Sequence, residues 1–153
     1  NLLLNKVVDK ENHKTYYERN FKVSKMNEVW CTDVTEFKLG EDKIYLSPII
    51  DLYNEEIIAY DLSEHPTMYQ IWNMMDQAYN KLLPNDKPIL HSDQGWQYQQ
   101  RSFQKDLEEH DITQSMSRKG NCLDNSIKPA SYIESILELK CSLIISLNAN
   151  KYL

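Results

Sequence analysis

The segment around Asp93 places the strongest constraint on how this chain folds. The apolar residues 88–90 lead directly into His91-Ser92-Asp93-Gln94-Gly95-Trp96-Gln97-Tyr98. An apolar run that ends in an acid and a glycine is typical of a short buried strand that delivers a carboxylate to an open cleft. A second acid, Asp33, lies inside the β-branched and aromatic run 28–37. Two acids on separate strands indicate a metal site for phosphate chemistry.

The composition predicts a single soluble domain. The chain has 153 residues, of which 41% are hydrophobic and 26% charged, and this is enough for one core rather than two. No apolar run approaches the roughly 18 residues of a membrane span, and we expect no secretory leader. Three cysteines without a Cys-x-x-Cys pair argue against a zinc cluster and against a disulfide framework. We therefore expect a cytoplasmic protein that makes no membrane contact.

The net charge of −6 weighs against DNA binding by this domain alone, because affinity for nucleic acid is usually led by Lys and Arg. A basic patch can still lie on a domain of negative net charge. If DNA is the partner, we expect basic regions outside this stretch to supply much of the affinity. Arg118 and Lys119 are candidates for phosphate contacts, with a solvated basic loop as the alternative. Trp96 and Tyr98 are candidates for stacking on exposed bases, with packing in or beside the core as the alternative.

Hydrophobic periodicity predicts the element order β-β-β-α-β-α-β after an irregular or helical lead-in at residues 1–27. Three strands joined by short turns form an antiparallel meander, in which Pro48 favours an edge or a bulge. A helix capped by Thr67 follows, and a second helix turns Phe103 and Leu107 inward. This order predicts an α/β fold with a mixed sheet, whose first and fourth strands are parallel neighbours. The expected strands are 29–37, 43–51, 56–62, 87–91 and 111–115, and the expected helices are 67–82 and 99–110.

Each acid also has an ordinary interpretation when taken alone. Asp33 could be a solvent-facing acid of a strand, and Asp93 could be a turn residue. Side by side at the centre of the sheet, however, two carboxylates would repel each other unless a cation neutralised them. Mg²⁺ binds through one or two carboxylates together with substrate phosphate oxygens, and a pair of such ions stabilises the attacking and leaving oxygens of a displacement at phosphorus. We expect His91 to be structural, or to support a ligand, rather than to bind the ion.

Several blocks in order resemble one family, the transposases of bacterial insertion sequences, whose catalytic core is similar to retroviral integrase. The resemblance runs from about residue 20 to Ile127 and implies a ribonuclease-H-like fold. It also implies an Asp-Asp-Glu active site that binds Mg²⁺ or Mn²⁺, and cleavage and strand transfer at transposon ends by a homo-oligomer on DNA. Asp33 and Asp93 match the first two acids. The blocks are Trp30–Thr35, Leu46–Asp51, Ile57–Tyr60, His91–Tyr98 and Gln114–Ser126.

The resemblance ends at the third acid. It divides the chain into a lead-in segment (1–25), an integrase-like catalytic core (26–127) and a divergent helical tail (128–153). The family has a Glu just after the position of Ile127, where this chain has Lys128-Pro129. Either a short insertion makes Glu134 the third catalytic acid and metal ligand, or a frameshift has removed it. A shift of five residues is about 7.5 Å along a helix, which exceeds the tolerance of a metal ligand unless the extra residues loop out.

The sequence is compatible with three functions. The first is a transposase catalytic core that cuts and joins transposon-end DNA by two-metal chemistry, impaired in this copy. The second is a relic that keeps the fold and at most binds DNA or partner subunits. The third is a ribonuclease-H-type nuclease acting on RNA–DNA hybrids.

Overall fold

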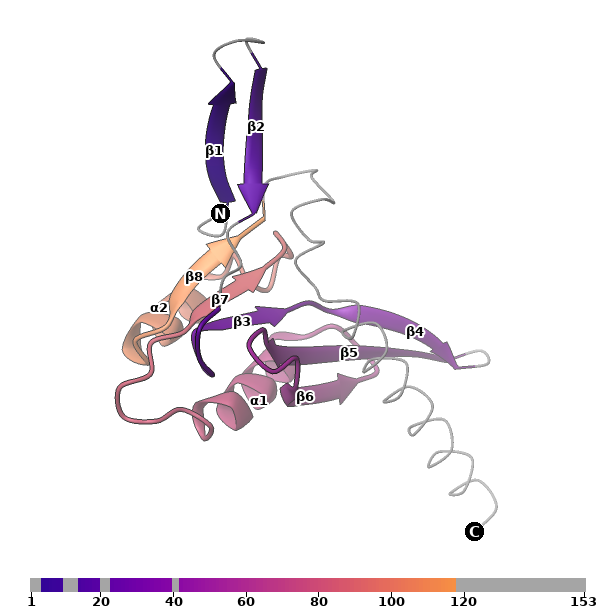
Figure 1. Ribbon diagram of the computed structural model, residues 1–153. Coiled ribbons are helices and arrows are strands. Elements are labelled where there is room, and N and C mark those ends of the chain that lie inside the picture. The colour runs from indigo at the N-terminus through magenta and orange to yellow at the C-terminus, as the bar shows by residue number, and fades with distance from the viewer. Residues whose placement is uncertain (1–3, 10–13, 20–22, 40–41, 118–153) are drawn as a thin grey trace.

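The computed structural model of the chain describes residues 4–9, 14–19, 23–39 and 42–117. Within them, six strands form one mixed sheet, two helices lie against it, and two further strands form a separate hairpin (Figure 1). Neither helix in these ranges is long and apolar enough to cross a bilayer. The expected tail, together with Arg118, Lys119 and Glu134, lies outside the described residues. The elements are β1 (Leu4–Asp9), β2 (Lys14–Arg19), β3 (Val29–Thr32), β4 (Thr35–Leu39), β5 (Asp42–Asp51), β6 (Ile57–Ser63), α1 (Met68–Tyr79), β7 (Ile89–Ser92), α2 (Arg101–Glu109) and β8 (Thr113–Met116).

The expected irregular or helical lead-in was wrong, because β1 and β2 form an antiparallel hairpin. Their register runs from Leu4 opposite Arg19 to Asp9 opposite Lys14. The segments LNKVVD and KTYYER are rich in β-branched and aromatic residues, which favour a pleated strand. Only four residues connect the two strands, so they pair locally. The hairpin is a sheet of its own, and its two strands stand apart from the six-stranded sheet (Figure 1).

The six-stranded sheet is mixed, as predicted. β5 pairs antiparallel with β3 and β4 along one edge and with β6 along the other. β3 pairs with β7, and β7 with β8, both in parallel. The predicted parallel pairing of the first and fourth strands of the core is therefore confirmed, since these strands are β3 and β7. This pairing is the part of the fold that positions the candidate site.

The expected strand 29–37 is divided into β3 and β4 at Asp33-Val34, and Pro48 on β5 explains the break. The register on both sides of the break places Pro48 opposite Asp33. Leu52 N donates to Val29 O at 3.0 Å, and hydrogen-bonded pairs recur at every second position of an antiparallel ladder. Pro48 therefore occupies a position that should donate to the backbone of Asp33, but proline has no N–H. The ladder is interrupted where the chain reaches the first acid.

The expected edge or bulge at Pro48 is partly confirmed. The ladder between β5 and β6 shifts register between Ile49 and Ile50, directly beside the proline. β5 is not an edge strand, however, because it has neighbours on both sides. A proline is tolerated inside this sheet because the strand opposite its nitrogen ends there.

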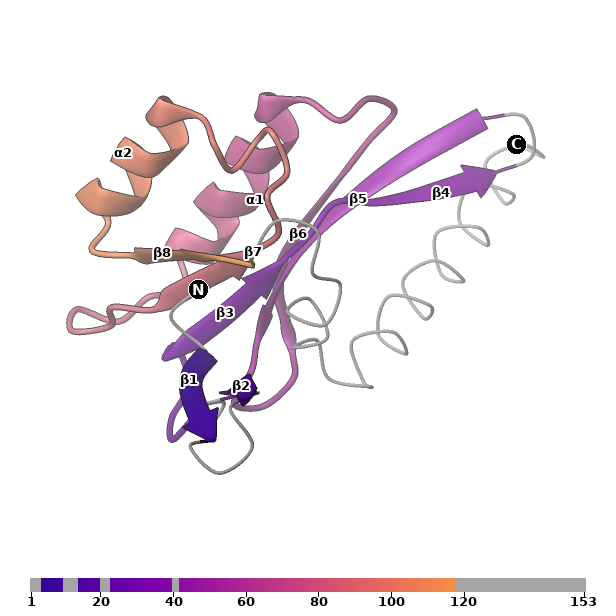
Figure 2. The same ribbon diagram turned by 90° about the horizontal axis from the view of Figure 1, so that it is seen from above.

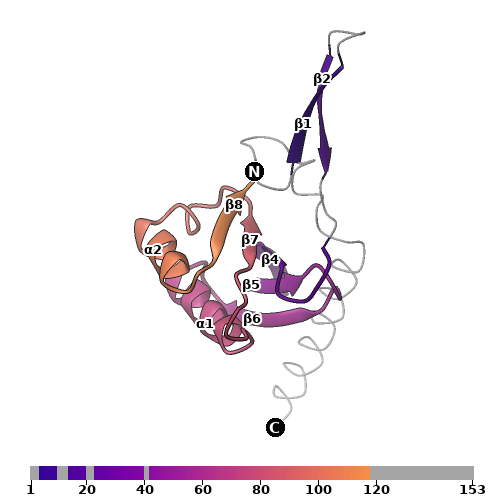
Figure 3. The same ribbon diagram turned by 60° about the vertical axis from the view of Figure 1, so that its left-hand side comes forward.

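Both helices cover the same face of the sheet, as Figures 2 and 3 show from two directions. Thr67 caps α1 by accepting a hydrogen bond from Gln70 N, as predicted. α1 ends at Tyr79, earlier than the expected end at residue 82. Phe103 and Leu107 on α2 are buried, also as predicted. The main core lies between these helices and the sheet and contains Trp30, Ile49, Ala59, Ile71, Met74, Met75, Ala78, Leu90, Tyr98, Phe103, Leu107 and Ile112.

Candidate active site at the ends of two parallel strands

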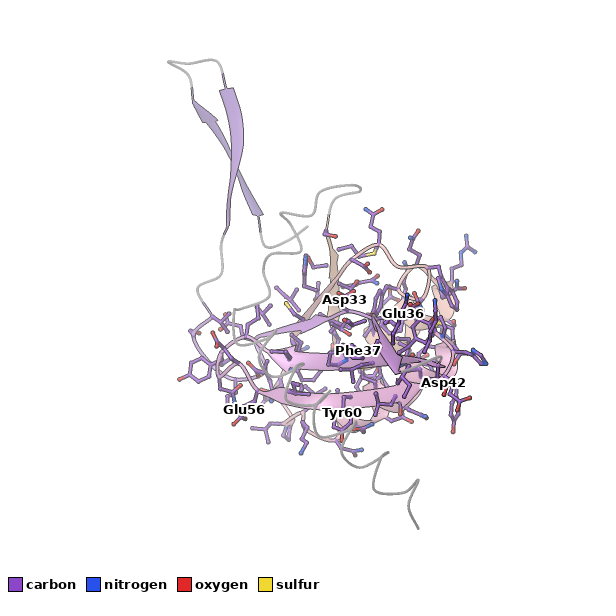
Figure 4. The ribbon with its side chains drawn as sticks, turned by 90° about the vertical axis from the view of Figure 1, so that its right-hand side faces the viewer. Asp33, Glu36, Phe37, Asp42, Glu56 and Tyr60 are labelled. Carbon is purple, nitrogen blue, oxygen red and sulfur yellow. The ribbon has the colours of Figure 1, made fainter. Side chains whose placement is uncertain are left out.

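The candidate site lies at the ends of the parallel strands β3 and β7, directly followed by Asp33 and Asp93. Their ladder matches Cys31 with His91, and the same register continued by two residues matches Asp33 with Asp93. Equivalent positions of neighbouring parallel strands share one face, about 4.8 Å apart. Both acids are half-buried and follow the last residue of their strand. Figure 4 shows Asp33 at the junction between β3 and β4. The two acids therefore follow the ends of neighbouring parallel strands.

The turn after β7 fixes the orientation of the Asp93 carboxylate. Gly95 N donates a hydrogen bond to Asp93 Oδ1 at 2.8 Å. A Cβ atom on Gly95 would lie 2.9 Å from the same oxygen and 3.0 Å from Gln97 Oε1. Only glycine allows this close approach without displacing the carboxylate. The Gln-Gly dipeptide noted in the sequence thus has a direct structural function beside the acid.

Hydrogen bonds from glutamine side chains stabilise the same turn, on which Trp96 is exposed. Gln94 Nε2 donates to Ser117 O at 3.0 Å, and Gln99 Nε2 donates back to Gln94 O. Gln100 Nε2 donates to Trp96 O at 3.1 Å. Trp96 is 50% exposed, which agrees with the expectation that its ring is accessible. The arrangement presents an aromatic ring three residues beyond Asp93 on a turn with several internal hydrogen bonds.

The expectation that Tyr98 stacks on a base was wrong, because Tyr98 is only 1% exposed. The turn 95–98, closed by a hydrogen bond from Tyr98 N to Gly95 O, directs this side chain under the sheet. Its ring packs edge-on against Phe103, with ring centroids 5.7 Å apart. Its hydroxyl forms a hydrogen bond with Thr32 Oγ1 at 3.2 Å. The alternative interpretation, that Tyr98 belongs to the core, is the correct one.

The pKa of Tyr98 depends on its burial and on the charges near it. Burial raises the pKa of its hydroxyl well above the ordinary value, and the negative charges of Asp33 and Asp93 raise that pKa further. Tyr98 remains neutral and keeps its proton for hydrogen bonding at physiological pH.

His91 lies in the core of the sheet, and its structural role stays a prediction. It is 3% exposed, and its Nδ1 lies 3.0 Å from Ser115 Oγ on β8. This contact links β7 to β8 at a position two residues before Asp93 in the sequence. His91 therefore supports the strand that carries the acid.

The two acids fit a hard divalent cation but do not complete its site. Across residues 23–39 and 42–117, no group of three or more His, Cys, Asp or Glu residues could hold a metal ion. Carboxylate oxygens are the ligands that Mg²⁺ prefers, and two are compatible with its usual protein contacts. The candidate third acid, Glu134, and the candidate phosphate contacts, Arg118 and Lys119, lie beyond the described ranges.

Sequence reasoning missed the polar residues beneath the acids. Thr32 and Ser47 are buried, and both donate hydrogen bonds to the sulfur of Met74 on α1. Only their places in the sequence could have pointed to these two residues, because Thr32 directly precedes Asp33 and Ser47 directly precedes Pro48. The sequence alone does not show that Thr32 and Ser47 contact the same methionine.

The chain matches the family model described as the integrase core domain over residues 23–122. The chain belongs to this family. It is 59% identical over 110 residues to the "Putative transposase InsK for insertion sequence element IS150" of Escherichia coli (strain K12), covering 72% of this chain and 39% of that protein. It is also 60% identical over 109 residues to an "Uncharacterized transposase-like protein" of Haemophilus influenzae, covering 71% of this chain and 50% of that protein. The chain thus spans half or less of the length of these two relatives.

The fold is also similar to that of one chain in a solved intasome structure. A chain of the simian T-cell lymphotropic virus intasome in complex with PP2A regulatory subunit B56 gamma aligns with a TM-score of 0.64 at 19% identity. The alignment covers 81% of this chain and 43% of that one. The predicted ribonuclease-H-like α/β class and the resemblance to insertion-sequence transposases are both confirmed.

Proposed function

We propose that this chain is the catalytic core of an insertion-sequence transposase, a polynucleotidyl transferase that cuts and joins transposon-end DNA. The observation that supports the proposal is the register of β3 and β7, which pairs Cys31 with His91 and, continued by two residues, would pair Asp33 with Asp93. The chain belongs to the integrase core family. The relatives named as transposases support the reaction class. Action as a homo-oligomer on DNA, in the cytoplasm of a bacterium, belongs to the same proposal.

Asp33 and Asp93 would hold Mg²⁺ or Mn²⁺ between their strand ends. When bound there, the cation supplies the charge that activates the attacking oxygen and stabilises the leaving oxygen at the phosphodiester. The protein would supply the geometry, because neighbouring parallel strands carry the two acids and Gly95 N donates a hydrogen bond to Asp93 Oδ1. Glu134 remains the candidate for the third ligand under the insertion hypothesis.

Trp96 is the best-supported DNA contact of the proposed site. Its ring is exposed, and the hydrogen bonds of Gln94, Gln99 and Gln100 restrict the turn that carries it. A base can stack on such a ring without sequence preference, which suits an enzyme that must reach the phosphodiester beside the stacked base. Arg118 and Lys119 remain proposed phosphate contacts.

A strand-nicking assay on duplex DNA that carries the ends of the encoding insertion sequence tests the function. We expect nicking with Mn²⁺ or Mg²⁺ and none with EDTA. Asp93→Asn keeps the oxygen that accepts from Gly95 N but removes the charge. It should therefore lower nicking by more than the roughly 10- to 100-fold typical of residues that only support a ligand.

Asp76→Asn is the matched control, since Asp76 is an exposed acid on α1, and it should nick like the wild type. Unchanged nicking by Asp93→Asn would contradict the assignment. An inactive wild-type chain that binds end DNA would instead favour the relic. Cleavage of RNA–DNA hybrid but not of duplex would favour the ribonuclease-H-type nuclease.

A further inference from the structure

Tyr98 connects the two segments that carry the acids. Its backbone belongs to the turn after Asp93, while its hydroxyl contacts Thr32, the residue before Asp33. Its carbonyl oxygen accepts a hydrogen bond from Gln114 Nε2 of β8 at 2.7 Å. The residue is thus anchored at its amide, its carbonyl and its hydroxyl, to three different parts of the sheet and turn.

The hydroxyl of Tyr98 belongs to a small polar cluster inside the apolar core. Thr32 Oγ1 lies 3.7 Å and Ser47 Oγ 3.1 Å from the same Met74 sulfur. Burying hydroxyl groups has a free-energy cost that a purely apolar packing would avoid. The cluster joins β3, β5, α1 and the turn after β7.

We propose that Tyr98 is a positioning residue for the metal site, whose hydroxyl fixes the end of β3 to the turn of Asp93 and thereby sets the separation of the two carboxylates. This inference rests on the proposed function. Residues that hold metal ligands in place affect metal affinity although they do not touch the ion. Here the path is short, because Thr32 is adjacent to Asp33 and Gly95, which is hydrogen-bonded to Tyr98, also holds Asp93.

A role in packing alone predicts a different result on removal of the hydroxyl. Tyr98→Phe keeps the ring and its contact with Phe103 while deleting one oxygen. If the ring only fills the core, the substitution affects folding stability at most and leaves the carboxylates where they are. If the hydroxyl sets their separation, metal affinity falls while the fold persists.

The test measures Mn²⁺ affinity of the whole chain by titration calorimetry, together with thermal unfolding. We expect Tyr98→Phe to bind Mn²⁺ about tenfold more weakly than the wild type. Thr32→Val removes the partner hydroxyl and should weaken binding to a similar degree. The double variant should be little weaker than either single variant, because both substitutions remove the same interaction.

Tyr79→Phe is the matched control. The Tyr79 hydroxyl donates to Asp106 between α1 and α2, in a pair that includes neither acid of the site. Its loss should lower the unfolding temperature and leave Mn²⁺ affinity unchanged.

Wild-type affinity in both Tyr98→Phe and Thr32→Val, with binding abolished in Asp93→Asn, would overturn the positioning role and leave the proposed function intact. A wild-type chain that binds no better than Asp93→Asn would overturn both. If Tyr98→Phe does not fold, Thr32→Val alone decides the question, since a threonine-to-valine change preserves the shape of the side chain.

Discussion

At the scale of single residues, Trp96 and Tyr98 show that two aromatic residues of one turn can have opposite surroundings. Trp96 is 50% exposed and Tyr98 is 1% exposed, although both follow Asp93 within five residues. The sequence predicted an aromatic-rich turn beside the acid but could not assign the two rings. The assignment depends on the tight turn at Gly95, which rotates Tyr98 inward and leaves Trp96 in solvent.

Trp96 supplies the test of DNA contact at this scale. Stacking of a base on an aromatic side chain contributes about 1–3 kcal/mol, so Trp96→Ala should weaken binding of transposon-end DNA about tenfold. Fluorescence anisotropy at one fixed salt concentration measures this affinity. Trp96→Phe keeps an aromatic face and should retain most of it. Equal affinity of Trp96→Ala and the wild type would exclude the stacking contact.

At the scale of elements, the fold was predictable where the signal is local. The helix capped by Thr67 and the helix with Phe103 and Leu107 inward follow from periodicity and capping, and both are present. The hairpin β1–β2 was missed because strand propensity competed with a charged composition. The break at Asp33 was missed because it depends on Pro48, which lies opposite only once the strands are paired.

Restoring the missing donor at residue 48 tests this explanation of the break. Pro48→Ala adds an N–H that faces the backbone of Asp33, so β3 and β4 should join into one ladder. The new amide should then exchange with deuterium slowly, like the amides of Leu46 and Ile50 on the same strand. Hydrogen exchange followed by NMR measures these rates. Exchange as fast as in the turn around Asn54 would contradict the explanation.

At the scale of the whole molecule, the site depends on a contact between segments far apart in the sequence. In the sequence, the three strands β4, β5 and β6 and the helix α1 lie between β3 and β7. The two strands nevertheless pair in parallel, and their register continued by two residues pairs Asp33 with Asp93. The two acids could be identified from sequence because each follows an apolar strand pattern. The third ligand could not, since the family pattern ends at Ile127.

The most direct measurement is an anomalous difference map from crystals of the chain soaked in Mn²⁺. We predict one peak at the joined ends of β3 and β7, with an oxygen of Asp33 and an oxygen of Asp93 each about 2.0–2.2 Å from it. A peak that touches neither acid, or carboxylates that point to opposite faces of the sheet, would contradict the account.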